Sequence, residues 1–553
     1  MQVTAEPGKT VAFYLMMLAT VSVGVYLRLD QFGLQVLLDD EWHVIHQLLV
    51  KNPRQLFLTF GHADFSIPLA LLYWTELKLF GLSEFGMRWP MLLAGLCTLV
   101  VLPVYARKYF SDKVTLLFSA LLVVSPMLLI YSRTARPYAL TMLLSLLAAG
   151  VLHSYFESEK PSWKLGLVYV VCAVVSAWLH LVSLPVVIAP FIVLGIPSLL
   201  DRNWRKVLRL FWLGVITLAG MLALLLPPLL SYPEMLAVKL GEQLPNAGTI
   251  YGALFVWLGT SSTAVVLSCL VFAVLGAHSL WHKFPLARSI ILGLLLTVGL
   301  ILLTQPAWVH NPLTFARYLL PAIPILLLAV AVGFFKSVEI LSSKLADGAK
   351  IYISLVLLAL FFGAVVYNSP LSRILSKPNS NSLHSLYQFD FRDQDNLIMI
   401  YQDDFPVSQF WQRLAVFPRD SLRIAASPFS FETHHWDAPR WEQISHQRVM
   451  PGYLDGFCAQ DRVGEVPNGN GFRFKNVGYL SDRDDLISRG FDLVVYQKPF
   501  KVQTYQGEKE FGIDTADCEL ELRAQFPAPV YEDRWLLAIP LSEQIREQFN
   551  TVN

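Results

Sequence analysis

Three carboxylates stand side by side at residues 39–41 of this chain, where charge is costly. Asp39, Asp40 and Glu41 follow residues 11–29, the first apolar run long enough to cross a membrane. Like charges gathered beside a bilayer repel one another, so the cluster indicates a functional site. A carboxylate in a partly dry pocket holds its proton more tightly and can act as a general base. The alternative is that Asp39 or Asp40 caps a helix that begins near Glu41.

The composition of the chain is that of a membrane protein. Of its 553 residues, 54% are hydrophobic and 15% are charged, and the mean hydropathy is +0.48. A net charge of +1, without a basic arm or a zinc-type Cys/His spacing, argues against a nucleic-acid partner. The first apolar run reaches membrane-spanning length and lacks a small-residue cleavage site, so we expect it to be retained as a signal anchor.

Apolar runs along the chain predict a polytopic helical bundle of about eleven spans. They lie at 11–29, 88–106, 114–132, 137–156, 164–182, 183–200, 207–229, 253–280, 287–304, 318–335 and 351–368. With a cytoplasmic N-terminus, the inner connections carry fourteen Lys and Arg residues and the short outer loops carry four. By the positive-inside rule, the acidic cluster, the long first loop and the C-terminal segment then lie outside the cytoplasm. We expect a multi-pass membrane protein.

The composition changes at about residue 369, which divides the chain into two expected domains. Residues 1–368 form the membrane domain, with a first outer loop at about 30–87, and residues 369–553 form a soluble α/β domain. Strands are expected at 396–401, 491–496 and 535–539, and a helix at 482–489. Cys458 and Cys518 share this exported domain, where a disulfide between them is permitted but not required.

The first outer loop is too long for a simple connector. Amphipathic stretches at 42–50 and just before Gly81 would lie along the membrane interface and form the wall of a cavity. Between them, His62 and Asp64 are candidates to bind sugar or acceptor, although a loop histidine beside a turn aspartate is an equal alternative.

The ordered motifs of residues 10 to about 335 resemble the GT-C glycosyltransferases. More narrowly, they resemble the bacterial group related to protein O-mannosyltransferases and to the lipid A aminoarabinose transferase. The resemblance is carried by the acidic cluster and by residues 79–90 (LFGLSEFGMRWP), 125–126 (SP), 131–138 (YSRTARPY), 179–180 (LH) and 316–324 (ARYLLPAIP). It implies a GT-C fold that moves a sugar from a polyprenyl-phosphate donor to an envelope glycan, lipid or protein at the outer face, with inversion. The soluble domain is covered by no motif of the group.

The resemblance assigns roles to individual residues. Asp40 matches the first-loop aspartate of the group and is expected to be the base, with Asp39 the next choice and Glu41 orienting it or binding sugar hydroxyls. The leaving phosphate needs a cation, and arginine suits phosphate through its paired donors. Arg317, at the outer end of a span, is the first candidate for this contact. Further substrate-binding candidates are Arg136, Tyr138, Arg88 and His180.

Each of these assignments has a structural alternative. Arg317 could be an interfacial arginine that extends toward water, Arg88 could pair with a carboxylate such as Glu84, and His180 could be a packing histidine. No cofactor is expected, although the first-loop carboxylates with His43 and His62 could in principle hold a divalent cation. In the soluble domain, the group formed by residues 434–437 and Trp441 could stack on sugars, or be an ordinary surface loop.

Two departures from the better-known relatives bear on the donor. The first loop offers His62 and Asp64 where the aminoarabinose transferase carries a Glu-x-Lys arrangement, and residues 136–138 (Arg-Pro-Tyr) stand where relatives show an aspartate. The sugar is therefore left unassigned. The rival functions are a transporter or flippase for lipid-linked glycans and a non-catalytic glycan-binding scaffold. A transporter would place ionisable groups at mid-membrane depth in symmetric halves, which this sequence does not show.

Overall fold

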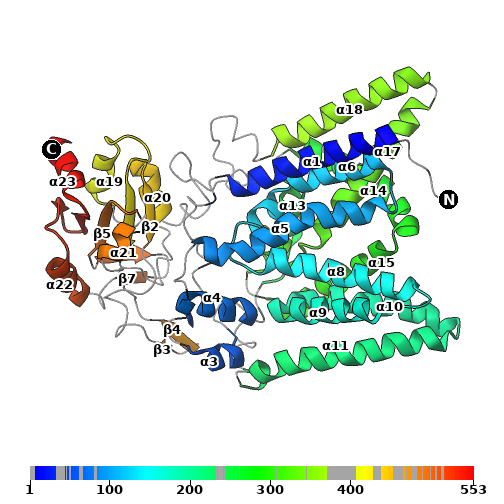
Figure 1. The fold of residues 1–553 in the computed structure, drawn as a ribbon, viewed down its shortest axis with the longest axis horizontal. Coiled ribbons are helices and arrows are strands. Elements are labelled where there is room, and N and C mark those ends of the chain that lie inside the picture. The colour runs from blue at the N-terminus through cyan, green and yellow to red at the C-terminus, as the bar shows by residue number, and fades with distance from the viewer. Residues whose placement is uncertain are drawn as a thin grey trace.

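The computed structural model consists of a long helical bundle and a smaller domain that contains a sheet (Figure 1). It describes residues 7–30, 32, 41, 44, 47–48, 51–60, 66–79, 84–231, 233, 241, 243–260, 262–306, 308–343, 345–369, 407–427, 437–451, 465–468, 471–474, 483–488, 490–498, 500–504, 507–511 and 516–552. We call the end of the bundle nearest the sheet domain the outer end, and the opposite end, where α1 begins, the inner end.

Nine helices of the described residues are long and apolar enough to cross a membrane. They are α1 (Pro7–Leu29), α5 (Glu84–Arg107), α8 (Tyr138–Glu157), α10 (Leu184–Leu200, preceded by the 3₁₀ turn η1, Leu181–Ser183), α11 (Trp204–Ser231), α14 (Thr263–Lys283), α15 (Pro285–Thr304), α17 (Ala322–Ser342) and α18 (Asp347–Tyr367). Large apolar side chains on them face outward, as with Leu303, which is 84% exposed. The prediction of a polytopic helical membrane protein is confirmed.

Three of the eleven expected spans differ from the prediction. The run at 164–182 is the 17-residue helix α9 (Trp163–Leu179). The run at 114–132 divides into α6 (Asp112–Val124) and α7 (Pro126–Tyr131), because a residue before proline is pushed to extended backbone and Ser125 adopts ψ 119°. Similarly, the run at 253–280 divides into α13 (Ala247–Leu258) and α14, because Gly259 ends α13 with φ 64°.

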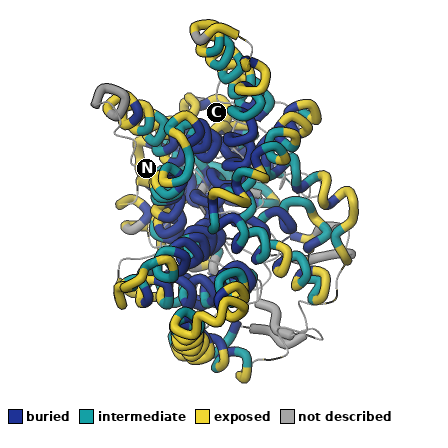
Figure 2. Tube along the Cα trace, turned by 90° about the vertical axis from the view of Figure 1, so that its right-hand side faces the viewer, coloured by how far each residue is buried: buried dark blue, intermediate teal, exposed yellow. Residues whose placement is uncertain are grey.

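The core of the membrane domain lies where α5, α6, α8, α14 and α17 pack together. Figure 2 shows buried residues toward the middle of the bundle and exposed residues on the peripheral helices. In the first outer loop, α3 (Pro53–Leu58) and α4 (Ile67–Leu79) lie at the outer end (Figure 1). Leu56, Leu69 and Tyr73 are buried, so this loop packs onto the bundle.

The C-terminal domain is built on a five-stranded mixed sheet in the order β2-β1-β5-β9-β8. Its strands are β1 (Arg423–Ser427), β2 (Arg448–Pro451), β5 (Leu493–Gln497), β8 (Tyr531–Glu532) and β9 (Leu536–Pro540). Strand β1 pairs in parallel with β2 and β5, whereas β9 runs antiparallel to β5 and β8. Two hairpins, β3 (Glu465–Asn468) with β4 (Gly471–Phe474) and β6 (Phe500–Thr504) with β7 (Gly507–Phe511), are separate ladders.

The sheet is covered by helices on both faces. Side chains of a strand alternate between faces, and along β9 Leu536 and Ala538 join one apolar cluster while Leu537 and Ile539 join the other. The first cluster is covered by α19 (Gln409–Leu414), α20 (Asp437–Ser445) and α23 (Glu543–Val552), and the second by α21 (Arg483–Ser488) and α22 (Ala516–Gln525). The prediction of a C-terminal α/β domain is confirmed.

Several of the expected features of this domain can be placed. The strands expected at 491–496 and 535–539 and the helix at 482–489 correspond to β5, β9 and α21. Trp441 stacks on Trp411 at 4.7 Å between ring centroids and is buried, so it is a core residue and not part of a surface sugar platform. Residues 396–401 and 434–436, Cys458 and the side chain of Cys518 lie outside the described residues.

Candidate active site

The site residues expected from sequence divide into those that the structure places and those that it does not. Asp39, Asp40, His62 and Asp64 lie outside the described residues, as does His43. The remaining six are described and lie on the first outer loop, the start of α5, the connection between α7 and α8, the end of α9, and α16 (Pro312–Tyr318): Glu41, Arg88, Arg136, Tyr138, His180 and Arg317.

Glu41 and Arg88 form a fully buried ion pair with two parallel hydrogen bonds. Arg88 Nε donates to Glu41 Oε1 at 2.7 Å and Arg88 Nη2 donates to Glu41 Oε2 at 2.6 Å, and both side chains are 0% exposed. The backbone N–H of Ala135 also donates to Glu41 Oε1 at 2.7 Å. Arg88 therefore forms the structural pair with a carboxylate that the sequence analysis considered. Its partner is Glu41 and not Glu84, which was named there as a possible partner. The pair joins the first outer loop to α5 and to the connection after α7.

That connection, residues 132–137, is fixed to the end of α1. The Arg133 guanidinium donates to the backbone carbonyls of Leu27, Arg28 and Asp30. Leu27 and Arg28 carry two of the last carbonyls of α1, which no amide of the helix can satisfy, and Asp30 directly follows the helix. Burial, and then the positive charge of Arg88, lowers the pKa of Arg133 to about 9, so it is still charged at neutral pH. The role of Arg133 is therefore to hold the connection in place.

A close approach between α5 and the connection completes this anchoring. A Cβ atom added at Gly95 would collide with the side chain of Ser132, and Arg28 Nε would lie 3.5 Å from it. Ser132 Oγ in turn donates to the carbonyl of Leu128 at 2.6 Å. Sequence reasoning missed the buried Arg28 and the anchoring role of Arg133. The sequence did contain a signal for Arg28, because an arginine in the last turn of an apolar span is unusual.

Beyond the connection, two arginines and three aromatic rings from separate segments gather in one cluster. The guanidinium carbons of Arg317 and Arg136 lie 5.4 Å and 5.9 Å from the ring centroid of Tyr138. Arg317 also lies 5.8 Å from the ring of Tyr318. The His180 ring is 5.3 Å from Tyr138 and 5.7 Å from Tyr318. The structure therefore brings together four of the expected substrate-binding residues, Arg136, Tyr138, His180 and Arg317.

Helix α16 carries Arg317 into this cluster and is held by α13. The side chain of Asn311 caps α16, accepting a hydrogen bond from the Leu313 N–H at 2.9 Å. From α13, Trp257 Nε1 donates to the Ala316 carbonyl at 3.1 Å, and Thr249 Oγ1 donates to the His310 carbonyl at 2.6 Å. These bonds hold the chain from His310 to Ala316, directly before Arg317, whose side chain is partly exposed.

His180 is a neutral member of the cluster. Its Nδ1 accepts a hydrogen bond from the Val182 N–H at 3.2 Å and so begins the turn η1. Burial, together with the positive charges of Arg136 and Arg317, lowers the pKa of His180 to about 3. A neutral imidazole adds no further positive charge, so the charge of the cluster comes from its two arginines. Two guanidinium groups beside aromatic rings form a setting that attracts an anion such as phosphate.

The divalent-cation alternative is not tested by this structure. No group of three or more His, Cys, Asp or Glu side chains that could hold a metal occurs in the part of the chain that the structure describes. Of the five residues considered for such a site, only Glu41 falls in that part, and both of its oxygens accept hydrogen bonds from Arg88.

Comparison with known proteins gives one family match. Residues 66–230 match the model of the family described as dolichyl-phosphate-mannose-protein mannosyltransferase. This range includes Arg88, Arg136, Tyr138 and His180. No curated protein matches the chain.

Solved structures of membrane glycosyltransferases are similar at low identity. ArnT from Cupriavidus metallidurans in the apo state is 12% identical, with 97% of this chain and 99% of that chain covered and a TM-score of 0.47. The Archaeoglobus fulgidus oligosaccharyltransferase tethered with an acceptor peptide is 12% identical (88% and 69% covered, TM-score 0.39). The arabinosyltransferase EmbB from Mycobacterium smegmatis is 10% identical (98% and 62% covered, TM-score 0.42).

The family match falls on the part of the chain that builds most of the site. It agrees with the resemblance of the ordered motifs, which the sequence carries on both sides of the matched range. Over residues 66–230, this chain is therefore similar to the dolichyl-phosphate-mannose-protein mannosyltransferase family.

Proposed function

We propose that this protein transfers a sugar from a polyprenyl-phosphate donor to an acceptor at the outer face of the membrane. The observation that carries the proposal is the convergence of Arg136 and Arg317 on the ring of Tyr138. A phosphate that leaves from a sugar gains charge as the glycosidic bond breaks, and positioned cations stabilise that charge. The matched family takes its description from a dolichyl-phosphate-linked sugar, a donor of this chemical class.

In the proposed reaction, an acceptor hydroxyl attacks the anomeric carbon while the bond from that carbon to the phosphate oxygen breaks. Asp40 takes the hydroxyl proton, and the lipid phosphate leaves with the bonding electrons toward Arg317 and Arg136. Attack from the side opposite to the phosphate inverts the configuration. Because Nδ1 of His180 accepts a hydrogen bond from the Val182 N–H, the neutral ring carries its proton on Nε2, which can donate a hydrogen bond to the sugar without adding charge.

The buried pair supports the role given to the first-loop aspartates. Asp40 is the chain neighbour of Glu41, and consecutive Cα atoms are about 3.8 Å apart. Glu41 is fixed to Arg88 and to the N–H of Ala135, which directly precedes Arg136. The proposed base is thus covalently joined to a residue that is anchored beside the proposed phosphate site. In this proposal Glu41 orients the loop, and His62 and Asp64 remain candidates for contacts to sugar or acceptor.

The proposed setting is the bacterial inner membrane, with the outer end of the bundle and the C-terminal domain outside the cytoplasm. The bias of Lys and Arg toward the inner connections supports this orientation. The acceptor would be an envelope glycan, lipid or protein that reaches the outer end of the bundle.

The test uses the full-length protein in lipid nanodiscs with undecaprenyl-phosphate-linked sugars. Envelope lipids and glycans from a deletion strain are first compared with those of the parent by mass spectrometry, which identifies the missing sugar and its acceptor. Purified protein should then move that sugar to that acceptor, and Asp40→Asn should not. Movement of intact lipid-linked glycan across vesicles without transfer would contradict the proposal and favour a flippase.

A further inference from the structure

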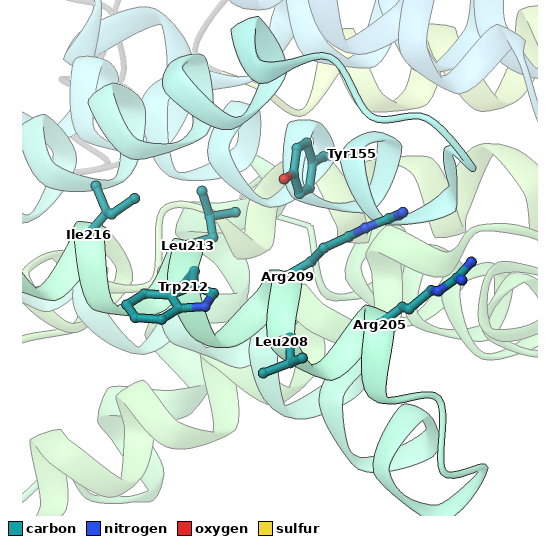
Figure 3. Close-up of a pocket in the computed structure, with 7 residues that line it drawn as sticks. All are labelled: Tyr155, Arg205, Leu208, Arg209, Trp212, Leu213 and Ile216. Carbon is teal, nitrogen blue, oxygen red and sulfur yellow. The ribbon is translucent and has the colours of Figure 1, made fainter.

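A hollow on the inner half of the bundle lies toward the end opposite the proposed active site. Its volume is about 440 Å³, and its walls come from α8 and from the first turns of α11 (Figure 3). The lining residues are Tyr155, Arg205, Leu208, Arg209, Trp212, Leu213 and Ile216. It opens at the surface, where Leu208, Trp212 and Ile216 are each more than half exposed.

The two ends of the hollow differ in chemistry. Figure 3 shows Arg205 and Arg209 extending in the same direction, away from Trp212 and Ile216 on later turns of α11. Arg209 donates to the backbone carbonyls of Ser158 and Glu159, which fixes its guanidinium beside the loop after α8. One end of the hollow is therefore cationic and the other end is apolar.

The surroundings of the cationic end carry a net positive charge. Residues 155–212 include six basic side chains, all near the inner end, and three acidic ones. The six are Lys160, Lys164, Arg202, Arg205, Lys206 and Arg209, and the three are Glu157, Glu159 and Asp201. Arg202 and Arg205 are exposed. Because α11 is one of the helices long enough to cross a membrane, this end lies at the level of lipid headgroups.

We propose that this hollow binds an anionic phospholipid of the inner leaflet, of the phosphatidylglycerol type. The phosphate lies at Arg205 and Arg209, and one acyl chain follows α11 along Leu208, Trp212 and Ile216. Exposed apolar residues are the expected contacts for an acyl chain, and basic pockets at the inner side of a bundle suit anionic headgroups. A zwitterionic lipid offers the same phosphate, but its positive headgroup would meet the surplus of basic side chains.

The test is native mass spectrometry of the full-length protein in detergent. Palmitoyl-oleoyl phosphatidylglycerol and palmitoyl-oleoyl phosphatidylcholine are added at equal concentrations, and the fraction of protein with each lipid bound is measured. The wild type should prefer phosphatidylglycerol. Arg205→Glu should lower its affinity at least fivefold, since one basic residue near an anionic lipid contributes about that factor. Arg205→Lys keeps the charge and should retain most of the binding.

The control is Lys283→Glu, which makes the same change of charge at the exposed inner end of α14 and does not line the hollow. It should bind phosphatidylglycerol like the wild type. Equal binding of the two lipids by the wild type, or equal losses in Arg205→Glu and Lys283→Glu, would overturn the proposal. Competition by undecaprenyl phosphate that removes all bound phosphatidylglycerol would assign the hollow to the carrier lipid instead. The experiment measures bound lipid, so its result does not depend on whether the protein transfers a sugar.

Discussion

The basic residues at the two ends of the bundle are in opposite environments. At the outer end, Arg88 and Arg133 are 0% exposed. At the inner end, Arg202 and Arg205 are exposed, on a segment that carries six basic residues. By count alone, the inner end is the more basic. The buried cations are at the outer end, and burying a charge costs free energy.

This difference separates positions where only charge matters from positions where geometry matters. A buried guanidinium loses its hydration, so it must be compensated by well-placed oxygens, as Arg88 is by both oxygens of Glu41 and Arg133 is by three backbone carbonyls. An exposed arginine keeps its water and needs no particular partner. Substitutions at the outer end should therefore have large and specific effects, and matched substitutions at the inner end should have small ones.

The largest expected contrast is between two Asp→Asn substitutions. Asp40→Asn should lower the rate of sugar transfer by about 10²- to 10⁴-fold, because a general base contributes about that much. Asp112→Asn, the same change at the inner end, should leave the rate unchanged. Single-turnover transfer assays in nanodiscs would measure both, after size-exclusion chromatography has shown that both variants are folded. Near-normal turnover by Asp40→Asn would remove it from the role of base.

The buried pair should respond strongly to the loss of one partner. Glu41→Gln leaves the Arg88 charge uncompensated, which costs about 3–5 kcal/mol in comparable buried pairs. Thermal unfolding in detergent should show a large fall in Tm. The double variant Glu41→Leu/Arg88→Met removes both charges and should regain most of the lost stability while staying inactive, because the first loop is no longer tied to Ala135. A Glu41→Gln variant as stable as the wild type would contradict the account of the pair.

Arg317 offers a sharper test of the outer cluster. Arg317→Ala should weaken donor binding and slow the chemical step, each by roughly tenfold or more, since hydrogen bonds to charged groups contribute about 1.5–3 kcal/mol. Arg317→Lys keeps the charge but loses the planar fork, so it should recover only part of the activity. The matched control is Arg205→Ala at the inner end, which should transfer sugar normally. Wild-type kinetics in Arg317→Ala would move the phosphate site elsewhere, with Arg136 the next residue to substitute.

The smallest expected effect is at a partly exposed pair of the inner end. Arg107 Nε and Asp112 Oδ1 lie 2.9 Å apart, with side chains 26% and 44% exposed. Asp112→Asn should lower stability by about 0.2–1 kcal/mol, as for surface pairs. Arg107 also donates to the Tyr14 hydroxyl and lies 3.9 Å from the ring centroid of Phe13, so it keeps other contacts. If Asp112→Asn lowered Tm as much as Glu41→Gln does, exposed and buried charges at the two ends would not differ in their importance for stability.

Much of the architecture could be predicted because membrane helices and buried strands leave local patterns. A run of about twenty apolar residues must form a helix in a bilayer, so the spans were visible without tertiary information. The apolar run at 535–539, which forms β9, and the change of composition near residue 369 predicted the α/β domain. Helix breaks were harder to predict, because Ser125 and Gly259 interrupt apolar runs without changing their hydropathy.

The sequence by itself determined which residues are chemically suited to the site, since an acidic triplet beside a span and arginines at span ends are rare and costly. Only the tertiary structure decided how they are used. It paired Arg88 with Glu41, assigned Arg133 to the end of α1, and gathered Arg136, Arg317 and His180 around Tyr138. A guanidinium can donate hydrogen bonds to a carboxylate, a carbonyl or a phosphate. Which of these it meets depends on helix packing between residues far apart in the chain, and no local pattern records that packing.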